Sequence, residues 1–340
     1  MAASGCDVVS REFEPDPLRA FAFDRRIRGD LIDSLHHIVG VYDEELSLRD
    51  DSYERFVANL SRKKVHPLAY SYYFDTVVAL EGEKPSEAKS AWRHLLATPF
   101  VEQALRIRDL GDPTTDTLAQ HYVRHYLSGS GIECPVYSPR PEESAASRAM
   151  ISEAMVLIEH TDPLLAQEIR ALICEILLAG GSTDKSSMTF DGASSFMLWG
   201  GILLNALRRG GALEMAQMLA HESAHGLLYG WALEGPLVLN GDEERYPSPL
   251  RRDPRPMEGI YHATFVSARM ARCVHKLLTA DVLDHDQTVQ AKLDFATNKM
   301  AFRRGYETIK KHAKLSSLGQ DLISNTHAAL VALDHELGKD

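Results

Sequence analysis

The sequence of 340 residues lacks an excess of positive charge, a secretory signal and a membrane-spanning apolar run. Its formal net charge of -11 argues against nucleic-acid binding, because that function requires a basic surface. The first 20 residues contain no basic region followed by an apolar stretch, and the apolar segment 169–180 is too short to cross a bilayer. We therefore expect a cytoplasmic protein with neither nucleic-acid nor membrane partners.

Cysteine is also scarce, and its spacing excludes two classes of protein. The four cysteines occur without any CxxC pair, at Cys6, Cys134, Cys174 and Cys273. This spacing indicates reduced thiols, and it argues against both a disulfide framework and a cysteine-based zinc site. The remaining composition, 44% hydrophobic and 25% charged, is typical of a soluble globular protein.

Apolar residues recur mainly at helical spacing, so the predicted fold is mainly α with a small β element. Extended structure is expected only at Cys134–Tyr137 and within Ser182–Asn205, which reads as an extended stretch or hairpin. The predicted helices lie near residues 31–39, 53–60, 86–96, 116–127, 143–158, 163–178, 211–229, 256–277 and in much of the remainder to residue 337.

Residues 128–147 contain Gly, Pro and Ser with little periodicity, which is typical of a linker. The prediction is an N-terminal helical region, residues 1–135, followed by a helical catalytic region, residues 136–340. The alternative is one continuous domain, which a chain of this length can form.

One motif has a direct chemical interpretation, the segment His221-Glu222-Ser223-Ala224-His225. Two histidines four residues apart lie one above the other on a helix, so their imidazoles can share a metal ion. Glu222 lies about 100° round the helix from His221, which places a carboxylate beside the open side of such a metal. We therefore predict a metal site on an HExxH helix, against the alternative of a solvated helical face.

A second histidine pair has the same spacing, His121 and His125, but the motif lacks an acidic residue. We interpret it as structural. The adjacent His36 and His37 point to different faces of a helix and cannot chelate one ion from it.

A metal needs a third protein ligand, and the next predicted helix offers two candidates. Arg255, Glu258, His262 and Arg269 recur on one face of it. His262 is the preferred ligand. Glu258 is the alternative, and it would complete the two-histidine, one-carboxylate set typical of non-haem iron.

Three blocks of this region resemble a known family. They are Gly200–Asn205, Met218–Leu228, which carries the motif, and Tyr246–His262, a proline-rich block of the approximate form PxRxDxRPxxGxxH. From Ser194 to about Ala271 the chain resembles the HExxH-motif family of iron- and 2-oxoglutarate-dependent peptide β-hydroxylases found beside ribosomally made peptides. The proline-rich block discriminates, because ordinary zinc peptidases lack it. One departure is Leu250, where an aromatic residue is expected.

The resemblance implies that His221, His225 and His262 bind Fe(II), and that Arg251, Asp253 and Arg255 lie near the site. The distal carboxylate of 2-oxoglutarate then requires a bidentate cation, for which Arg255 is the first candidate and Arg251 and Arg269 the others. Glu222 becomes a group that orients a ligand or water. The implied partner is a precursor peptide of natural-product biosynthesis.

Two other function classes stay open at this point. A zinc metallopeptidase would use the same histidines with Glu222 as general base. A helical interaction protein without metal, serving a peptide-modification system, is the third class. The sequence leaves undecided which peptide residue is modified, whether a leader peptide is bound, and the oligomeric state.

Overall fold

The computed structural model describes residues 10–101, 105–127, 135–181, 190–208, 210–250 and 253–337. They form two compact units, and both are assembled from separate stretches of the chain. The sheet unit comprises Asp24–Ala154 and Ile169–Met215, and the C-terminal unit comprises Met1–Phe23, Met155–Glu168 and Ala216–Asp340. The domain boundary expected near residue 135 falls inside the sheet unit.

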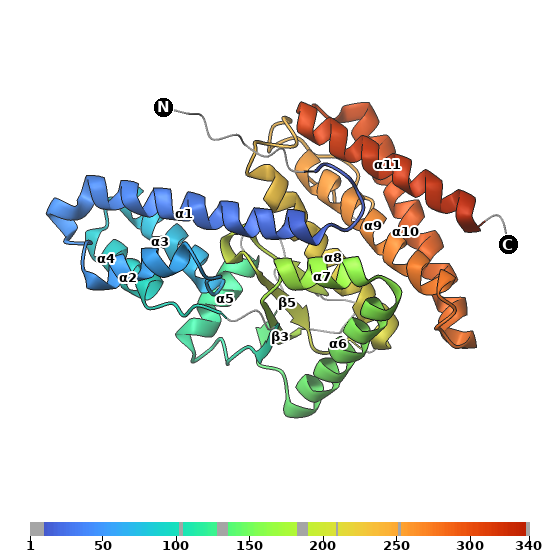
Figure 1. Cartoon of the computed structure of the whole chain (residues 1–340), viewed down its shortest axis with the longest axis horizontal. Coiled ribbons are helices and arrows are strands. Elements are labelled where there is room, and N and C mark those ends of the chain that lie inside the picture. The colour runs from blue at the N-terminus through green and yellow to red at the C-terminus, as the bar shows by residue number, and fades with distance from the viewer. Residues whose placement is uncertain are drawn as a thin grey trace. The chain divides into compact units, whose positions relative to one another are not determined.

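Helices make up most of the sheet unit, as the apolar periodicity predicts. Asp50 caps the second helix, because its carboxylate accepts hydrogen bonds from the backbone N–H groups of Ser52 and Tyr53. Five helices, of which the first begins in the C-terminal unit, are labelled in Figure 1: α1 (Pro17–Leu46), α2 (Asp51–Leu60), α3 (Leu68–Glu81), α4 (Pro85–Leu96) and α5 (Thr117–Leu127).

The small β element is a mixed sheet in which β3 and β5 are central. Its strands are β1 (Arg106–Asp109), β2 (Val136–Tyr137), β3 (Glu175–Gly181), β4 (Gly192–Ser194) and β5 (Gly201–Asn205). The order is β1-β3-β5-β4, with β1, β3 and β5 parallel and β4 antiparallel to β5. The expected extended stretch is thus present at β4 and β5, while residues 182–189 lie outside the described part. The short strand expected at Cys134–Tyr137 appears as β2, and Cys134 itself is not among the described residues.

The helix predicted over Pro163–Leu178 is wrong in its second half. Helix α7 (Pro163–Leu172) ends there, and the chain continues as β3. All seven residues of β3 are buried. A short, continuously apolar run fits a buried strand as well as a buried helix, so its periodicity does not discriminate between them. Pairing with β1 and β5 decides the outcome.

The expected linker also contains regular structure, because α6 (Pro141–Thr161) begins inside it. Proline suits the first position of a helix, since its missing N–H has no intrahelical partner there. Glu142 and Glu143 in the first turn complement the helix dipole.

The C-terminal unit is built on α8 (Gly211–Ala232), α9 (Met257–Thr279), α10 (His285–His312) and α11 (Ser317–Leu337). Trp231 of α8 packs edge-on against Phe265 of α9, with ring centroids 5.7 Å apart. A Cβ at Gly305 of α10 would lie 2.0 Å from the hydroxyl oxygen of Thr264, so glycine permits α9 and α10 to approach closely. The predicted helices of this region are confirmed.

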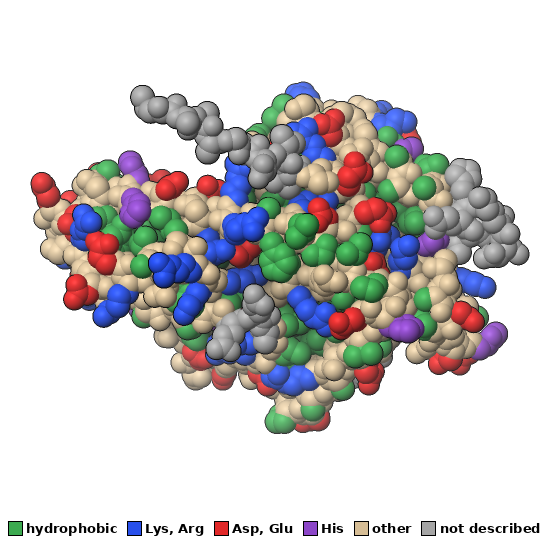
Figure 2. Space-filling view, in the orientation of Figure 1, with side chains coloured by type: hydrophobic (Ala, Val, Ile, Leu, Met, Phe, Trp, Pro, Cys, Tyr) green, Lys and Arg blue, Asp and Glu red, His purple; other side chains and the backbone are tan. Residues whose placement is uncertain are grey.

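Charged side chains, which make up 25% of the sequence, are visible on the surface of the protein (Figure 2). On the face shown in Figure 2, Lys and Arg side chains are interspersed with Asp and Glu. Within the described part of the chain, each helix is too short or too polar to cross a membrane.

Candidate functional site

Helix α8 carries the HExxH motif on a boundary between buried and partly exposed sides. The apolar residues beside the motif are fully buried, namely Leu219, Ala220, Ala224, Leu227 and Leu228. His221 and His225 lie one turn apart on the partly exposed side. Glu222 is only 2% exposed. The amphipathic pattern of the sequence therefore positions the two imidazoles at the edge of the core.

Three imidazoles meet in a histidine row, formed by His221 and His225 of α8 and His262 of α9. Nε2 of His225 lies 3.3 Å from Nε2 of His221. On its other nitrogen, Nδ1 of His225 lies 3.0 Å from Nδ1 of His262. Although 37 residues separate His225 and His262, the packing of α8 on α9 brings their rings face to face, with centroids 5.3 Å apart.

An aromatic residue that the sequence reasoning missed completes this arrangement. Tyr229 lies one turn after His225, and its ring centroid is 6.4 Å from that of His225 and 5.6 Å from that of His262. The i, i+4 spacing of His225 and Tyr229 was a signal that could have indicated it. Tyr229 gives the row an aromatic wall.

The surroundings of the row favour the neutral form of His225 and His262 near neutral pH. Burial lowers the pKa of His262 to about 4. Burial also holds the pKa of His225 well below its usual value, and the neighbouring His221 and His262 lower it further. Desolvation penalises the charged form of a histidine, and the neutral form is the one that binds metals.

Of the two candidate third ligands, the structure brings His262 against the motif residue His225. Glu258 lies one turn earlier on α9, at an exposed position. The helix begins at Met257, so Glu258 stands in its first turn, where a carboxylate complements the helix dipole.

Two residues of the proline-rich block before α9 pair with each other through their backbones. Tyr246 and Arg255 exchange two backbone hydrogen bonds, of 2.8 and 2.9 Å, in an antiparallel bridge. Arg255 thus lies in this bridge, two residues before α9 begins at Met257, and its Nε donates to Asp253 Oδ2 over 3.1 Å. Arg251 lies outside the described residues. The bridge thus holds the backbone of Arg255, and the guanidinium of Arg255 contacts the carboxylate of Asp253.

Arg269 occupies a different environment from the one expected for a cosubstrate ligand. It is 1% exposed and donates to the Phe13 carbonyl over 2.8 Å and to the buried carboxylate of Glu168. Glu168 also accepts from Arg19 over 2.9 Å. A buried charge needs such partners, so the Arg269 guanidinium serves the core of the C-terminal unit.

The second histidine pair has a carboxylate partner that its own helix does not supply. Asp75 of α3 lies against His121 and His125 of α5. Among the residues that the structure describes, these three are the group whose potential ligand atoms all lie within 4.8 Å of one another. The histidine row is less compact, because His225 presents a different nitrogen to each neighbour.

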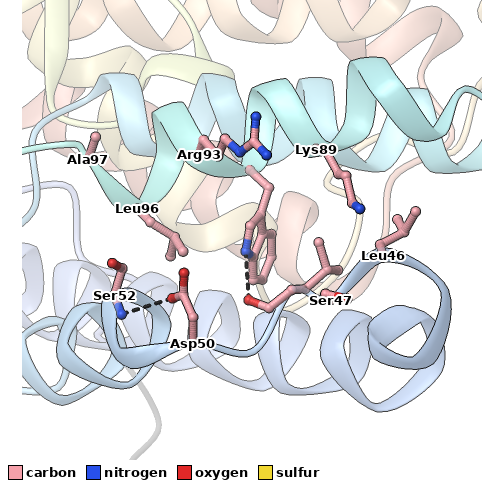
Figure 3. A pocket seen from close by; sticks show the side chains of 10 residues that line it. Leu46, Ser47, Asp50, Ser52, Lys89, Arg93, Leu96 and Ala97 are labelled. Atoms are coloured by element: carbon pink, nitrogen blue, oxygen red, sulfur yellow. Dashed lines mark hydrogen bonds between the residues drawn. The ribbon is translucent and has the colours of Figure 1, made fainter.

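A hollow of about 340 Å³ lies elsewhere in the sheet unit, between the end of α1, the start of α2 and α4. Figure 3 shows its polar rim, with Asp50 and Ser52 opposite Lys89 and Arg93. At its base, Trp92 Nε1 donates to the Leu48 carbonyl over 3.1 Å. Among the described residues that line it, none is a histidine, so we place the candidate site at the histidine row rather than here.

Comparisons with known proteins add no assignment: no family model matches the chain, and no curated protein matches it significantly. The geometry and chemistry of the site therefore carry the functional argument.

Proposed function

We propose that this protein is an Fe(II)- and 2-oxoglutarate-dependent oxygenase that β-hydroxylates a side chain of a ribosomally made peptide. The observation that carries the proposal is the histidine row, in which two helices bring together three imidazoles with nitrogen contacts of 3.0 and 3.3 Å. Neutral imidazoles suit divalent iron and zinc, and three protein ligands leave coordination positions open.

The donor chemistry fits a metal, and His221, His225 and His262 are the residues that would hold it. His225 now presents a different nitrogen to each neighbour, so binding one ion through all three residues requires the row to close around it. Ferrous iron and 2-oxoglutarate would supply the means to use molecular oxygen as the oxidant that hydroxylation of an unactivated C–H bond requires, with 2-oxoglutarate converted to succinate and CO2. Burial would keep the imidazoles of His225 and His262 neutral, which is the form that binds a metal.

Glu222 then acts by position rather than as a hydrolytic base. Its carboxylate is 2% exposed, which separates it from bulk water. A buried carboxylate beside a metal site can orient a ligand imidazole or a water molecule. This assignment distinguishes the oxygenase from a zinc peptidase, in which Glu222 would take a proton from metal-bound water.

Arg255 is the residue that we propose for the distal carboxylate of 2-oxoglutarate, with Arg251 as the alternative. The antiparallel bridge to Tyr246 anchors the Arg255 backbone beside the start of α9, which carries His262. Its present partner is Asp253, a largely exposed carboxylate. The Arg255 side chain is 21% exposed and that of Asp253 61%, so the carboxylate of this pair, rather than the guanidinium, is the group in contact with solvent.

The test is anaerobic titration of 2-oxoglutarate into the iron-loaded chain while its charge-transfer absorption is recorded. We expect a band in the native protein and succinate formation when a precursor peptide and oxygen are added. His221→Ala and His225→Ala should abolish iron binding at the histidine row and the band while circular dichroism shows that the helices persist. His285→Ala, an exposed histidine of α10, is the matched control and should behave as the native chain.

Two outcomes would refute the oxygenase. One is the absence of any band in the iron-loaded native chain. The other is zinc-dependent peptide hydrolysis that Glu222→Gln abolishes, which would identify a metallopeptidase instead.

A further inference from the structure

A second group of metal-ligand side chains lies in the sheet unit, separate from every residue of the proposed oxygenase site. This ligand triad consists of Asp75 on α3 and of His121 and His125, one turn apart on α5. Nδ1 of His121 lies 3.5 Å from Asp75 Oδ2, and Nε2 of His125 lies 3.1 Å from Asp75 Oδ1. Two ligands at about 2.0–2.1 Å from a tetrahedral zinc ion are about 3.3 Å apart, and the observed separations bracket that value.

A buried serine fixes the proton on the His121 ring. The Ser71 hydroxyl donates its single hydrogen to the Leu68 carbonyl over 3.0 Å. It must therefore accept the 2.8 Å hydrogen bond from Nε2 of His121. Nε2 carries the ring proton, and Nδ1 presents its lone pair to Asp75. A hydrogen bond to the second ring nitrogen is the usual way in which proteins orient a histidine ligand.

Stacking also holds the His121 ring in this orientation. The ring of Tyr72 lies 4.3 Å from that of His121, centroid to centroid, with an interplanar angle of 28°. His121 and His125 are both nearly buried, with side-chain exposures of 9% and 3%. Because both rings are fixed by packing, little side-chain entropy remains to be lost on binding an ion.

A cation already lies at the triad, in the form of the Arg124 guanidinium. Its Nη2 is 3.2 Å from Nδ1 of His121, 3.1 Å from Nε2 of His125, and in contact with the Asp75 carboxylate. One guanidinium nitrogen carries two hydrogens, so it cannot give each of these three acceptors a hydrogen of its own. The Arg124 side chain is 57% exposed, so it can swing into solvent and leave the three ligand atoms to another cation.

We propose that the sheet unit binds one Zn²⁺ through the Asp75 carboxylate, His121 Nδ1 and His125 Nε2, with Arg124 displaced. The ion joins α3 to α5 and leaves a fourth position for water, as three-ligand zinc sites do. This site goes beyond the proposed oxygenase, because it uses none of its residues. The competing explanation is an ion-pair cluster in which Arg124 is the permanent cation.

The experiment uses the full-length chain with His221→Ala and His225→Ala, so that zinc binding at the HExxH helix does not contribute. Calorimetric titration with Zn²⁺ should give one equivalent, and Co²⁺ should give the visible absorption of a low-symmetry site. Asp75→Asn and His121→Ala should abolish binding. Ser71→Ala should weaken it about 10- to 100-fold, because the ligand loses its orienting hydrogen bond.

Arg124→Ala provides the discriminating result, because it leaves every ligand in place. We expect tighter zinc binding, since the competing cation is gone. His37→Ala is the control: this histidine lies at an exposed position on α1 and is not a ligand. Circular dichroism of each variant verifies folding.

The proposal is overturned if this chain binds no zinc, if it binds zinc only after Arg124→Ala, or if Asp75→Asn and His121→Ala leave binding unchanged. Its failure is distinct from failure of the oxygenase. In the chain with an intact HExxH motif, Asp75→Asn should leave the iron–2-oxoglutarate absorption band as it is.

Discussion

Removing the His262 imidazole should flatten the pH dependence of stability in the metal-free protein. Burial lowers the pKa of His262 from 6.5 to about 4 in the folded chain. Between these values the unfolded chain binds more protons than the folded chain, so protons favour unfolding. The stability that the neutral, buried ring retains at pH 7 is therefore lost as the pH falls through this window. His262→Gln removes the titrating group and with it this loss.

The size of the effect follows from the two pKa values. At about 1.4 kcal/mol per pH unit, a pKa lowered from 6.5 to about 4 costs about 3 kcal/mol of stability once the pH is below 4. Between pH 7 and pH 5, where only part of the window is crossed, the loss is about 2 kcal/mol. Burial also lowers the pKa of His225. This residue therefore adds a loss of stability of the same sign, which the His262→Gln variant retains.

The assay is urea unfolding at pH 7 and at pH 5 in the presence of a chelator, followed by circular dichroism. The native chain should lose about 2 kcal/mol more than His262→Gln between the two conditions. His37→Gln, at an exposed position on α1, is the matched control and should keep the native pH dependence. If His262→Gln shows the same loss as the native chain, the ring is not desolvated in the way the structure implies.

Three further predictions concern ligand choice, cosubstrate and core. His262→Ala should lower iron occupancy more than Glu258→Ala, measured by metal analysis after dialysis, and the reverse order would make the carboxylate the third ligand. Arg255→Ala should raise the 2-oxoglutarate requirement about thirtyfold or more while iron still binds, and an unchanged titration would exclude this arginine. Glu168→Gln should destabilise the chain by about 3–5 kcal/mol in urea unfolding, because it leaves Arg269 without its buried counter-charge, and a native-like midpoint would contradict that role.

Much of the helical structure follows from local sequence signals. The helix predicted over 211–229 is α8, and the one predicted over 116–127 is α5 within one residue. Long amphipathic segments can be predicted in this way because the contacts that define their period lie within the segment. The failure at Pro163–Leu178 has the converse cause. Its second half is buried on every side in a sheet, and only strands distant in sequence reveal that.

For the functional groups, the sequence alone identified the motif histidines and proposed His262 from its place on the next helix. The helical period determines which residues share a face, so these proposals needed no tertiary information. Only the folded chain placed Asp75 beside His121 and His125, across 46 and 50 positions of sequence, and placed Arg269 against Glu168. A pattern within one helix cannot show which charges meet from different helices, because packing between helices decides it.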